Sequence, residues 1–218
     1  MTSQAITFYN ANDAFDYYYD YIMHSGKRSN SHKTLYILNC GFYIMNPQQN
    51  EITEKWRKWN KEYAEYEWQW YLSGDQNADA IAERAKIWKQ MQDEDGNVRT
   101  NYGYQWNINS HIYYVVQELQ RDPNSRRAVI SLYDGKEHST YQYDTPCTLA
   151  IHFYIEDNKL DMSVMMRSND LVYGFCNDQY CFSKLQQLIA ERLGCEVGIY
   201  YHFASNMHIY ERHFSIKK

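Results

Sequence analysis

The chain has 218 residues, of which 44% are hydrophobic, and its formal net charge is −5, from 22 Lys and Arg against 27 Asp and Glu. This length and composition predict one compact domain over residues 1–218 and exclude a repeat array or a disordered chain. The negative charge argues against broad electrostatic binding to nucleic acid, so an anionic ligand would need a local basic cluster.

Neither membrane insertion nor a cysteine framework is predicted. No apolar stretch approaches the roughly 18 residues of a membrane span, and residues 1–12 lack the basic and apolar regions of a secretory signal. The five cysteines form no C-x-x-C pair, which favours reduced thiols over disulfides or a zinc site. We therefore expect a cytoplasmic protein without a bound metal.

The N-terminal part of the chain is predicted to contain a helix, a polar loop and a buried strand. Apolar residues spaced i, i+3, i+4, i+7 indicate an amphipathic helix over 11–23, with Asn10 or Asn12 as its cap. The polar run 25–32 is expected to be a loop, and the apolar run 34–45 a buried strand.

Aromatic residues then recur at steps of three and four, which predicts one long helix over 52–72. Glu67 lies at the edge of this stripe, which should face inward. A buried carboxylate needs a partner or a function, so a catalytic role stays open beside simple pairing with a base. The aromatic residues themselves are best explained as core: Trp56, Trp59, Tyr63, Tyr66 and Trp70.

The rest of the chain changes from helical to strand-like sequence and ends on a helix and a last strand. Clustered strands between helices, with one antiparallel hairpin, predict an α+β or mixed-sheet domain. No G-x-G-x-x-G, P-loop or H-E-x-x-H motif occurs, which disfavours a Rossmann enzyme, a P-loop NTPase and a zincin. The expected elements are helices over 78–92, 107–120 and 178–193, the last closed by Gly194, and strands over 128–133, 147–156, 159–167 and 196–214, with a tight turn at Asp157-Asn158.

Two short segments carry residues suited to bind an anion or to form a covalent bond. Arg126 and Arg127 follow Ser125 in a short connection and could form a compact anion trap, although these residues taken alone favour a solvated turn. Cys147 opens a predicted strand and Arg167 ends the next one. A guanidinium near a thiol favours the nucleophilic thiolate, whereas a cysteine considered alone is more often structural.

Two further segments are rich in polar side chains. Residues 166–178 connect a strand to a helix and are suited to bind a small polar ligand at the helix start. His208 and Tyr210 alternate on one strand, so their side chains lie on one face.

These segments together resemble the thymidylate synthase superfamily, and within it the deoxycytidylate (dCMP) hydroxymethylases of bacteriophage type. The resemblance covers about residues 33–214, with the blocks in the family's order. The blocks are E-W-Q-W-Y-L-S-G-D (67–75), K-I-W (86–88), N-Y-G-Y-Q-W (101–106), S-R-R (125–127), P-C (146–147), R-S-N-D-L-V-Y-G-F-C-N-D (167–178) and H-I-Y-E-R-H-F (208–214).

The resemblance implies a thymidylate synthase-like fold, with a large mixed β-sheet flanked by helices and a sheet face packed in a homodimer. It implies that 5,10-methylenetetrahydrofolate is the co-substrate, and that Arg126 and Arg127 are donated to the partner's active site. It assigns catalysis to Cys147, Glu67, Asp178 and Tyr102, substrate binding to Arg28, Arg126, Arg127, Arg167, Ser168, Asn169, Asp178, His208 and Tyr210, and cofactor binding to Trp88, Asp170 and Gly174.

The implied chemistry suits these side chains. Addition of the Cys147 thiolate to C6 of a pyrimidine makes C5 nucleophilic towards the folate's one-carbon unit, and Glu67 would order water and move protons. Asp178 stands where uracil-specific relatives have Asn, and a carboxyl suits the amine of cytosine. Simple capping of the last helix is the alternative role for Asp178.

The expected activity is therefore C5 hydroxymethylation of dCMP, with water as the final nucleophile, in nucleotide biosynthesis for DNA modification. One alternative is reductive methylation of a pyrimidine monophosphate such as dUMP, as in thymidylate synthases. The other is a catalytically inactive nucleotide-binding relative. No direct contact with nucleic acid or membranes is expected, and the compartment is the host cytoplasm if a phage encodes the protein.

Overall fold

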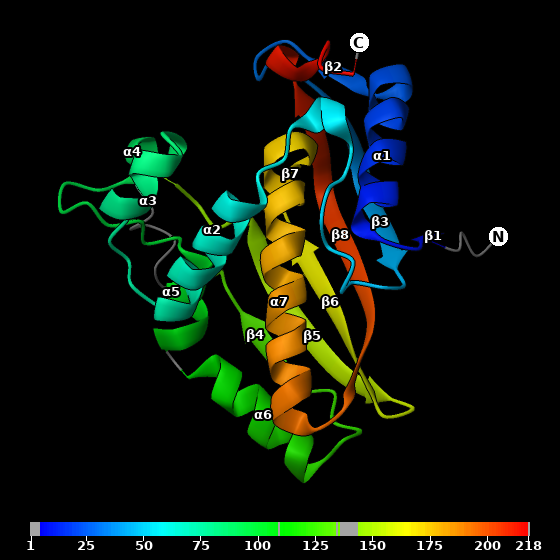
Figure 1. The fold of residues 1–218 in the computed structure, drawn as a ribbon, viewed down its shortest axis with the longest axis vertical. Coiled ribbons are helices and arrows are strands. Elements are labelled where there is room, and N and C mark those ends of the chain that lie inside the picture. The colour runs from blue at the N-terminus through cyan, green and yellow to red at the C-terminus, as the bar shows by residue number, and fades with distance from the viewer. Residues whose placement is uncertain (1–4, 109, 134, 136–143, 218) are drawn as a thin grey trace.

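The computed structural model describes residues 5–108, 110–133, 135 and 144–217 (Figure 1). Within these residues, a mixed sheet of eight strands has the order β1-β3-β8-β6-β5-β4, with β2 beside β3 and β7 beside β8. The strands are β1 Ile6–Phe8, β2 Lys27–Ser29, β3 Thr34–Ile44, β4 Val129–Ser131, β5 Thr148–Glu156, β6 Lys159–Met166, β7 Asn169–Asp170 and β8 Glu196–Tyr210.

The helices include two short 3-10 helices (η1, η4) and one π-helix (η3). They are α1 Ala11–Ser25, η1 Lys55–Arg57, α2 Lys61–Ser73, α3 Asp79–Arg84, α4 Ile87–Met91, α5 Tyr102–Ile108, α6 His111–Arg121, η3 Leu171–Phe175, α7 Cys176–Leu193 and η4 Glu211–His213. Figure 1 shows α1, α2 and α7 on the same side of the sheet. The predicted α+β class with a large mixed sheet is confirmed.

The strand directions explain where the functional segments meet. β8 runs antiparallel to β3 and parallel to β6, while β5 and β6 form the predicted hairpin. Asp157 and Asn158 both have positive φ, 47° and 60°, as a two-residue hairpin turn requires. The carboxyl ends of β6 and β8 therefore lie at one edge of the sheet, together with the start of β5.

The helix α7 forms the centre of the helical layer. Its apolar residues Phe182, Leu185 and Ile189 are fully buried. It begins two residues earlier than predicted because η3 continues directly into it. Gly194 ends the helix as predicted, with φ 70° and its N–H donating to the Ala190 carbonyl oxygen.

The prediction of one helix over 52–72 is wrong. Lys58 has left-handed backbone geometry, φ 51°, and breaks the chain between η1 and α2. The Asn60 side chain then accepts from the backbone N–H of Tyr63 and starts α2. Trp56 and Trp59 consequently precede the helix, although both still pack against the core.

Other predicted boundaries also change. The helix over 78–92 is two helices, α3 and α4, because Ala85 between them is extended. The helix over 107–120 is α5 and α6, with Ser110 at φ 54° between them. The expected loop 25–32 contains β2, and the last strand ends at Tyr210 before η4.

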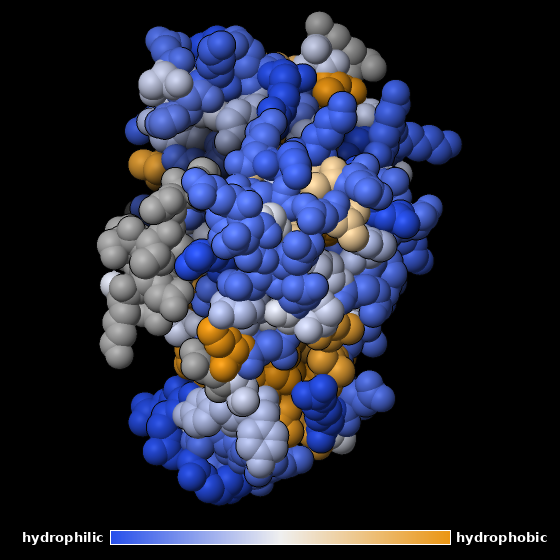
Figure 2. Space-filling model, turned by 90° about the vertical axis from the view of Figure 1, so that its left-hand side faces the viewer, coloured by the Kyte–Doolittle hydropathy of each residue, from blue (hydrophilic) through white to orange (hydrophobic). Residues whose placement is uncertain are grey.

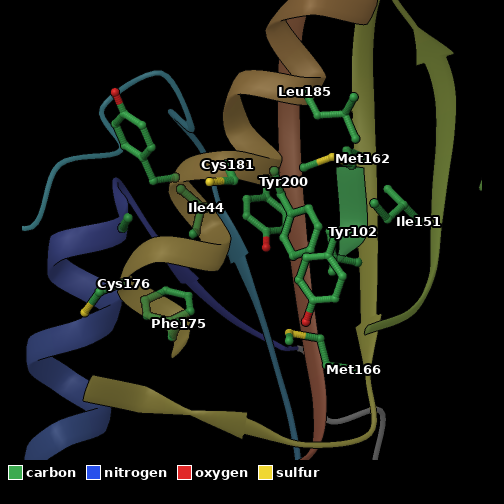
Figure 3. Packing of buried hydrophobic residues seen from close by; sticks show 14 of the residues in the cluster. Ile44, Tyr102, Ile151, Met162, Met166, Phe175, Cys176, Cys181, Leu185 and Tyr200 are labelled. Atoms are coloured by element: carbon green, nitrogen blue, oxygen red, sulfur yellow. The ribbon is translucent and has the colours of Figure 1, made fainter. Parts of the chain in front are cut away.

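The core lies between α7 and the sheet and holds both hydrocarbon and polar aromatic groups. Figure 3 shows Tyr102, Tyr200 and Cys181 among its apolar side chains, and all three are buried.

Figure 2 shows one side of the molecule as largely hydrophilic, with hydrophobic residues gathered in its lower part, above α6. No helix among the described residues is long and apolar enough to cross a membrane.

The other face of the sheet is less covered. Along β8, the buried residues Tyr200 and His202 alternate with the half-buried Tyr201 and Phe203. Tyr201 packs against Tyr43 of β3 with ring centroids 4.8 Å apart. This face therefore presents aromatic side chains that the described part of a single chain leaves partly exposed.

Candidate active site

Cys147 and Arg167 meet where β5 begins and β6 ends. The Arg167 backbone N–H donates to the Cys147 carbonyl oxygen at 2.8 Å, and its Nη2 lies 3.8 Å from Sγ. The guanidinium also donates to the carbonyl oxygens of Pro146 and Thr145, at 2.9 and 2.7 Å. These bonds hold the exposed Arg167 beside the half-buried thiol, as the hairpin pattern predicts.

Burial disfavours the thiolate form of Cys147. Burial raises the pKa of Cys147 to about 12, and the Arg167 charge, which lowers this pKa, only partly opposes it. The nearby carboxyls of Asp178 and Asp144 raise it further. The expectation that Arg167 alone favours the thiolate is therefore incomplete, because desolvation outweighs the single cation.

A half-buried carboxyl lies at the start of α7. The Asp178 Oδ2 accepts a hydrogen bond from Asn169 Nδ2 at 2.8 Å. Burial, and next the charge of Glu67, raise the pKa of Asp178 well above its usual range, although the Asn169 bond lowers it. An added Cβ on Gly174 would lie 2.9 Å from Asn169 Nδ2, so only glycine allows this close approach.

Glu67 is buried on α2, as its position in the stripe predicts. The Tyr71 hydroxyl donates to its Oε1 at 2.9 Å. Burial raises the pKa of Glu67 to about 7, whereas hydrogen bonds from Tyr71 and Tyr63 lower it. A carboxyl with this pKa can both give and take a proton near neutral pH.

Tyr102 of α5 is buried and interacts electrostatically with both Asp178 and Cys147. Its ring stacks on Phe182 with centroids 5.5 Å apart. Burial raises its pKa well above the usual value, and the charges of Asp178 and Cys147 raise it further. The structure thus brings Cys147, Glu67, Asp178 and Tyr102 into one interacting group, although they come from four separate segments.

His208 and Tyr210 lie at the end of β8, beside Asp170 of β7, which pairs with His208. Their rings are perpendicular with centroids 5.0 Å apart. Burial lowers the pKa of His208 to about 4, so the imidazole is neutral at pH 7. Ser168 is half-buried in the bend between β6 and β7.

Two further arginine sites lie outside this group. Arg28 of β2 donates to Glu211 at 2.6 Å, next to Tyr210. Arg126 and Arg127 are exposed and precede β4, whose Val129 pairs with His152 in the middle of β5. Within one chain the structure therefore does not bring Arg126 and Arg127 to Cys147.

The residues expected to contact the folate have partners within the chain. The Trp88 indole N–H donates to the Tyr63 hydroxyl at 2.8 Å, and its half-buried ring contacts Trp70 with centroids 4.9 Å apart. The Asp170 carboxylate accepts from the backbone N–H groups of Val172 and Tyr173, which caps η3. Burial raises the pKa of Asp170 to about 6.

Sequence reasoning missed several residues that support the site. Tyr71 is four residues after Glu67, a helical spacing that could have indicated their contact. Buried Glu118 accepts from Ser125 Oγ at 2.6 Å and from Arg127 Nε at 3.0 Å, and no local pattern marks its burial. Arg57 donates to the Val172 carbonyl oxygen at 2.5 Å. No cluster of three or more metal-binding side chains occurs among the described residues.

A half-buried thiol, an adjacent guanidinium and two carboxyls with raised pKa thus interact with one another, an arrangement that is suited to covalent catalysis. The thymidylate synthase family model matches residues 16–218, and the chain belongs to this family. The family is one of one-carbon transferases.

Similar proteins carry the name thymidylate synthase. That of Bacillus mojavensis is 29% identical over 189 residues, covering 83% of this chain and 67% of the relative. That of Fusobacterium nucleatum is 31% identical over 169 residues, covering 75% and 61%. That of Vesicomyosocius okutanii is 31% identical over 158 residues, covering 68% and 60%. The aligned region thus spans about two thirds of these relatives.

Proposed function

We propose that this protein transfers a one-carbon unit to C5 of a pyrimidine deoxynucleoside monophosphate, with dCMP as the substrate and 5-hydroxymethyl-dCMP as the product. The observation that carries this proposal is the half-buried Asp178 carboxyl in the same group as the Cys147 thiol. The first supports recognition of an amino-pyrimidine, and the second supports covalent activation of its ring.

Cys147 acts as the nucleophile. Its sulfur bonds to C6 of the pyrimidine and the thiol proton leaves, so the electrons of the C5–C6 double bond become available at C5. After C5 has gained the new carbon and lost its proton, the bond between that carbon and the folate nitrogen would break and water would add to the carbon in its place. Loss of the sulfur from C6 then restores the C5–C6 double bond. The phosphate of a bound nucleotide would pair with the Arg167 guanidinium. The pyrimidine ring would then lie against the Cys147 thiol, in an orientation that allows the sulfur to bond to C6.

Glu67 moves protons at the base and at the new carbon. Its pKa of about 7 allows it to act as acid in one step and as base in another. The Tyr71 hydroxyl donates to its Oε1 and so restricts the carboxyl, whose charge raises the pKa of Asp178. Tyr102 lies close enough to Cys147 and Asp178 to support the same proton transfers.

Asp178 selects the base. Cytosine presents an acceptor at N3 and an amine donor at C4, and a neutral carboxyl donates to the first and accepts from the second. The raised pKa of Asp178 favours this neutral form. In a water-excluded site a mismatched polar edge is strongly excluded, so the base that binds depends on which Asp178 oxygen carries the proton.

The arginines and the β8 residues bind the rest of the nucleotide. Arg167 and Ser168 suit the phosphate, with Arg28 closing over it, and His208 and Tyr210 suit the sugar hydroxyl. Two chains would pack through the aromatic face of the sheet, and each would donate Arg126 and Arg127 to the other's phosphate. The distance of these arginines from Cys147 within one chain supports such an exchange.

The folate co-substrate fits the residues beside the nucleotide site. When bound, 5,10-methylenetetrahydrofolate supplies the one-carbon unit. Trp88 offers a half-buried aromatic ring, and the Asp170 carboxyl accepts from two backbone N–H groups among the described residues and so retains acceptor capacity for ring N–H donors. Gly174 lies at the adjoining turn, against the Asn169 amide.

Reductive methylation of dUMP is the second candidate. The names of the relatives favour it, because those compared above are thymidylate synthases. Asp178 favours the first candidate. The two reactions also leave different folates: tetrahydrofolate after addition of water, and dihydrofolate after reduction.

The test is incubation of the purified protein with methylenetetrahydrofolate and, separately, dCMP, dUMP and their ribonucleotides. We expect 5-hydroxymethyl-dCMP and tetrahydrofolate, measured by chromatography and mass spectrometry. A methylated product with dihydrofolate would establish the second candidate. Binding of dCMP without exchange of its C5 hydrogen with solvent would identify an inactive relative.

A further inference from the structure

The hydrogen bond between Asn169 and Asp178 is partly buried and lies against Gly174. Asn169 is 3% exposed, and its Nδ2 lies 2.8 Å from Asp178 Oδ2. The same Oδ2 would lie 3.3 Å from a Cβ added to Gly174. The amide and the carboxyl are therefore held against the turn that starts α7, with little room to rotate.

A neutral carboxyl alone would not separate cytosine from uracil. It has one donor oxygen and one acceptor oxygen, and the proton can sit on either. With the proton facing N3 it matches cytosine. With the proton facing the C4 substituent it matches uracil, which has a donor at N3 and an acceptor at O4. Selectivity thus requires something that decides which oxygen carries the proton.

We propose that Asn169 is this specificity residue: its Nδ2 donor keeps Asp178 Oδ2 an acceptor, so that the pair accepts the amine of cytosine and rejects O4 of uracil. An N–H group facing Oδ2 excludes a proton from that oxygen and places it on Oδ1. This inference rests on the proposed function, because it assumes that Asp178 faces the base.

A second observation points in the same direction. The Asn169 Oδ1 is buried and has no hydrogen-bond partner among the described residues. An unpaired buried acceptor is costly unless a ligand supplies a donor. The amine of cytosine carries two N–H groups, one for Asp178 Oδ2 and one for Asn169 Oδ1, whereas O4 of uracil carries none.

The experiment compares the wild-type protein with Asn169→Leu, which has a similar volume and no amide. The measured quantity is the ratio of dissociation constants for dUMP and dCMP, obtained by calorimetry, together with the ratio of C5-hydrogen exchange rates. We expect the preference for dCMP to fall by about 10-fold or more in Asn169→Leu, with dUMP binding becoming tighter, because Oδ2 can then carry the proton.

Two further variants keep the test decisive if Asn169→Leu does not fold. Gly174→Ala inserts a methyl group 2.9 Å from Asn169 Nδ2, and should displace the amide and lower the same ratio. Asn177→Leu is the matched control on α7, since its Oδ1 accepts from the Trp59 indole and does not contact Asp178. Its base preference should remain that of the wild type.

The outcomes separate the two hypotheses. If the wild-type protein does not prefer dCMP, the proposed function is wrong. If it prefers dCMP and both Asn169→Leu and Gly174→Ala keep that preference, the role of Asn169 is wrong while the proposed function stands. A loss of the preference for dCMP in Asn177→Leu as large as that in Asn169→Leu would also overturn the role of Asn169.

Discussion

The two ends of the candidate nucleotide site differ in how their charged groups are held. At the base end, the Glu67 carboxyl is buried and the Asp178 carboxyl is half-buried, neither forms an ion pair among the described residues, and desolvation raises the pKa of each. Of the arginines proposed to bind the phosphate, Arg28 and Arg127 are exposed and pair with Glu211 and with the buried Glu118. Solvent screens exposed pairs, whereas a buried carboxyl feels each neighbour strongly. Substitutions at the base end should therefore have the larger effects.

The largest expected effect is at the thiol. Cys147→Ser replaces the nucleophile by a hydroxyl that is far less acidic, so turnover should fall by roughly three orders of magnitude or more, while nucleotide binding is kept. Turnover is measured with methylenetetrahydrofolate and dCMP, and binding by calorimetry. Cys195→Ser is the matched control because that thiol lies at the opposite end of β8. Near-normal turnover in Cys147→Ser would rule out covalent catalysis.

Glu67→Gln should have the next largest effect on catalysis. The amide cannot exchange a proton, so kcat should fall about 10²- to 10⁴-fold with little change in dCMP affinity. The rates of C5-hydrogen exchange and of product formation should fall together. An unchanged rate of exchange would remove Glu67 from proton transfer at the base.

Glu67→Gln should also change how the free energy of unfolding depends on pH. The native pKa of Glu67 is raised from 4.5 to about 7, so folding favours the protonated form. Its contribution to the free energy of unfolding is complete below about pH 4.5 and is lost as pH rises through 7, by roughly 3 kcal/mol. Denaturant titrations should show that Glu67→Gln loses less stability than the wild type over this range.

Glu65→Gln is the control for this stability measurement. Glu65 lies on the same helix, and although burial raises its pKa, hydrogen bonds from Gln69 and Tyr180 lower it overall. Its stabilising contribution is therefore present above its unfolded pKa and lost as pH falls. If both variants changed the pH dependence in the same direction, burial would not be what sets the pKa of Glu67.

At the phosphate end, Glu118→Gln should have a smaller effect. Glu118 holds Arg127 at 3.0 Å, and the amide would keep the shape but lose the charge that orients the guanidinium. We expect KM for dCMP to rise about 10-fold with kcat nearly unchanged. Mixing Glu118→Gln chains with Cys147→Ser chains tests whether arginines are exchanged between subunits. In a mixed dimer, the Glu118→Gln chain supplies an intact Cys147, and the Cys147→Ser chain supplies an Arg127 that is still held by Glu118, so one active site should work normally. A large fall in kcat with unchanged KM would contradict this role.

The smallest effect is expected at Arg28. Its pair with Glu211 is about half exposed on both sides, and such pairs contribute only about 0–1 kcal/mol. Arg28→Ala should raise KM by less than about five-fold, and the difference should shrink at high salt. A large, salt-independent loss would show that Arg28 is buried in the working enzyme.

Local patterns predicted much of the sheet and of the thiol site. Asp157 and Asn158 tolerate the positive φ that a hairpin turn needs, and this hairpin aligns Cys147 with Arg167. Gly194 marks the end of α7 for the same backbone reason. These features depend on residues near one another in sequence, so the sequence alone is enough to indicate them.

The features that sequence patterns missed depend on tertiary contacts. Lys58 and Ser110 adopt left-handed geometry although neither residue favours it, and their breaks divide two predicted helices. The Asn169 bond to Asp178 depends on close approach of Gly174, and the burial of Glu118 depends on the packing of α6. No spacing along the chain contains this information.

The most direct test of base selection is the ratio of kcat/KM for dCMP and dUMP in Asp178→Asn. An amide can donate to O4 and accept from N3–H, so we expect the preference to move towards dUMP by about 10²-fold or more. The Cys147 chemistry should persist in the variant. An unchanged preference for dCMP would contradict the claim that this carboxyl chooses the base.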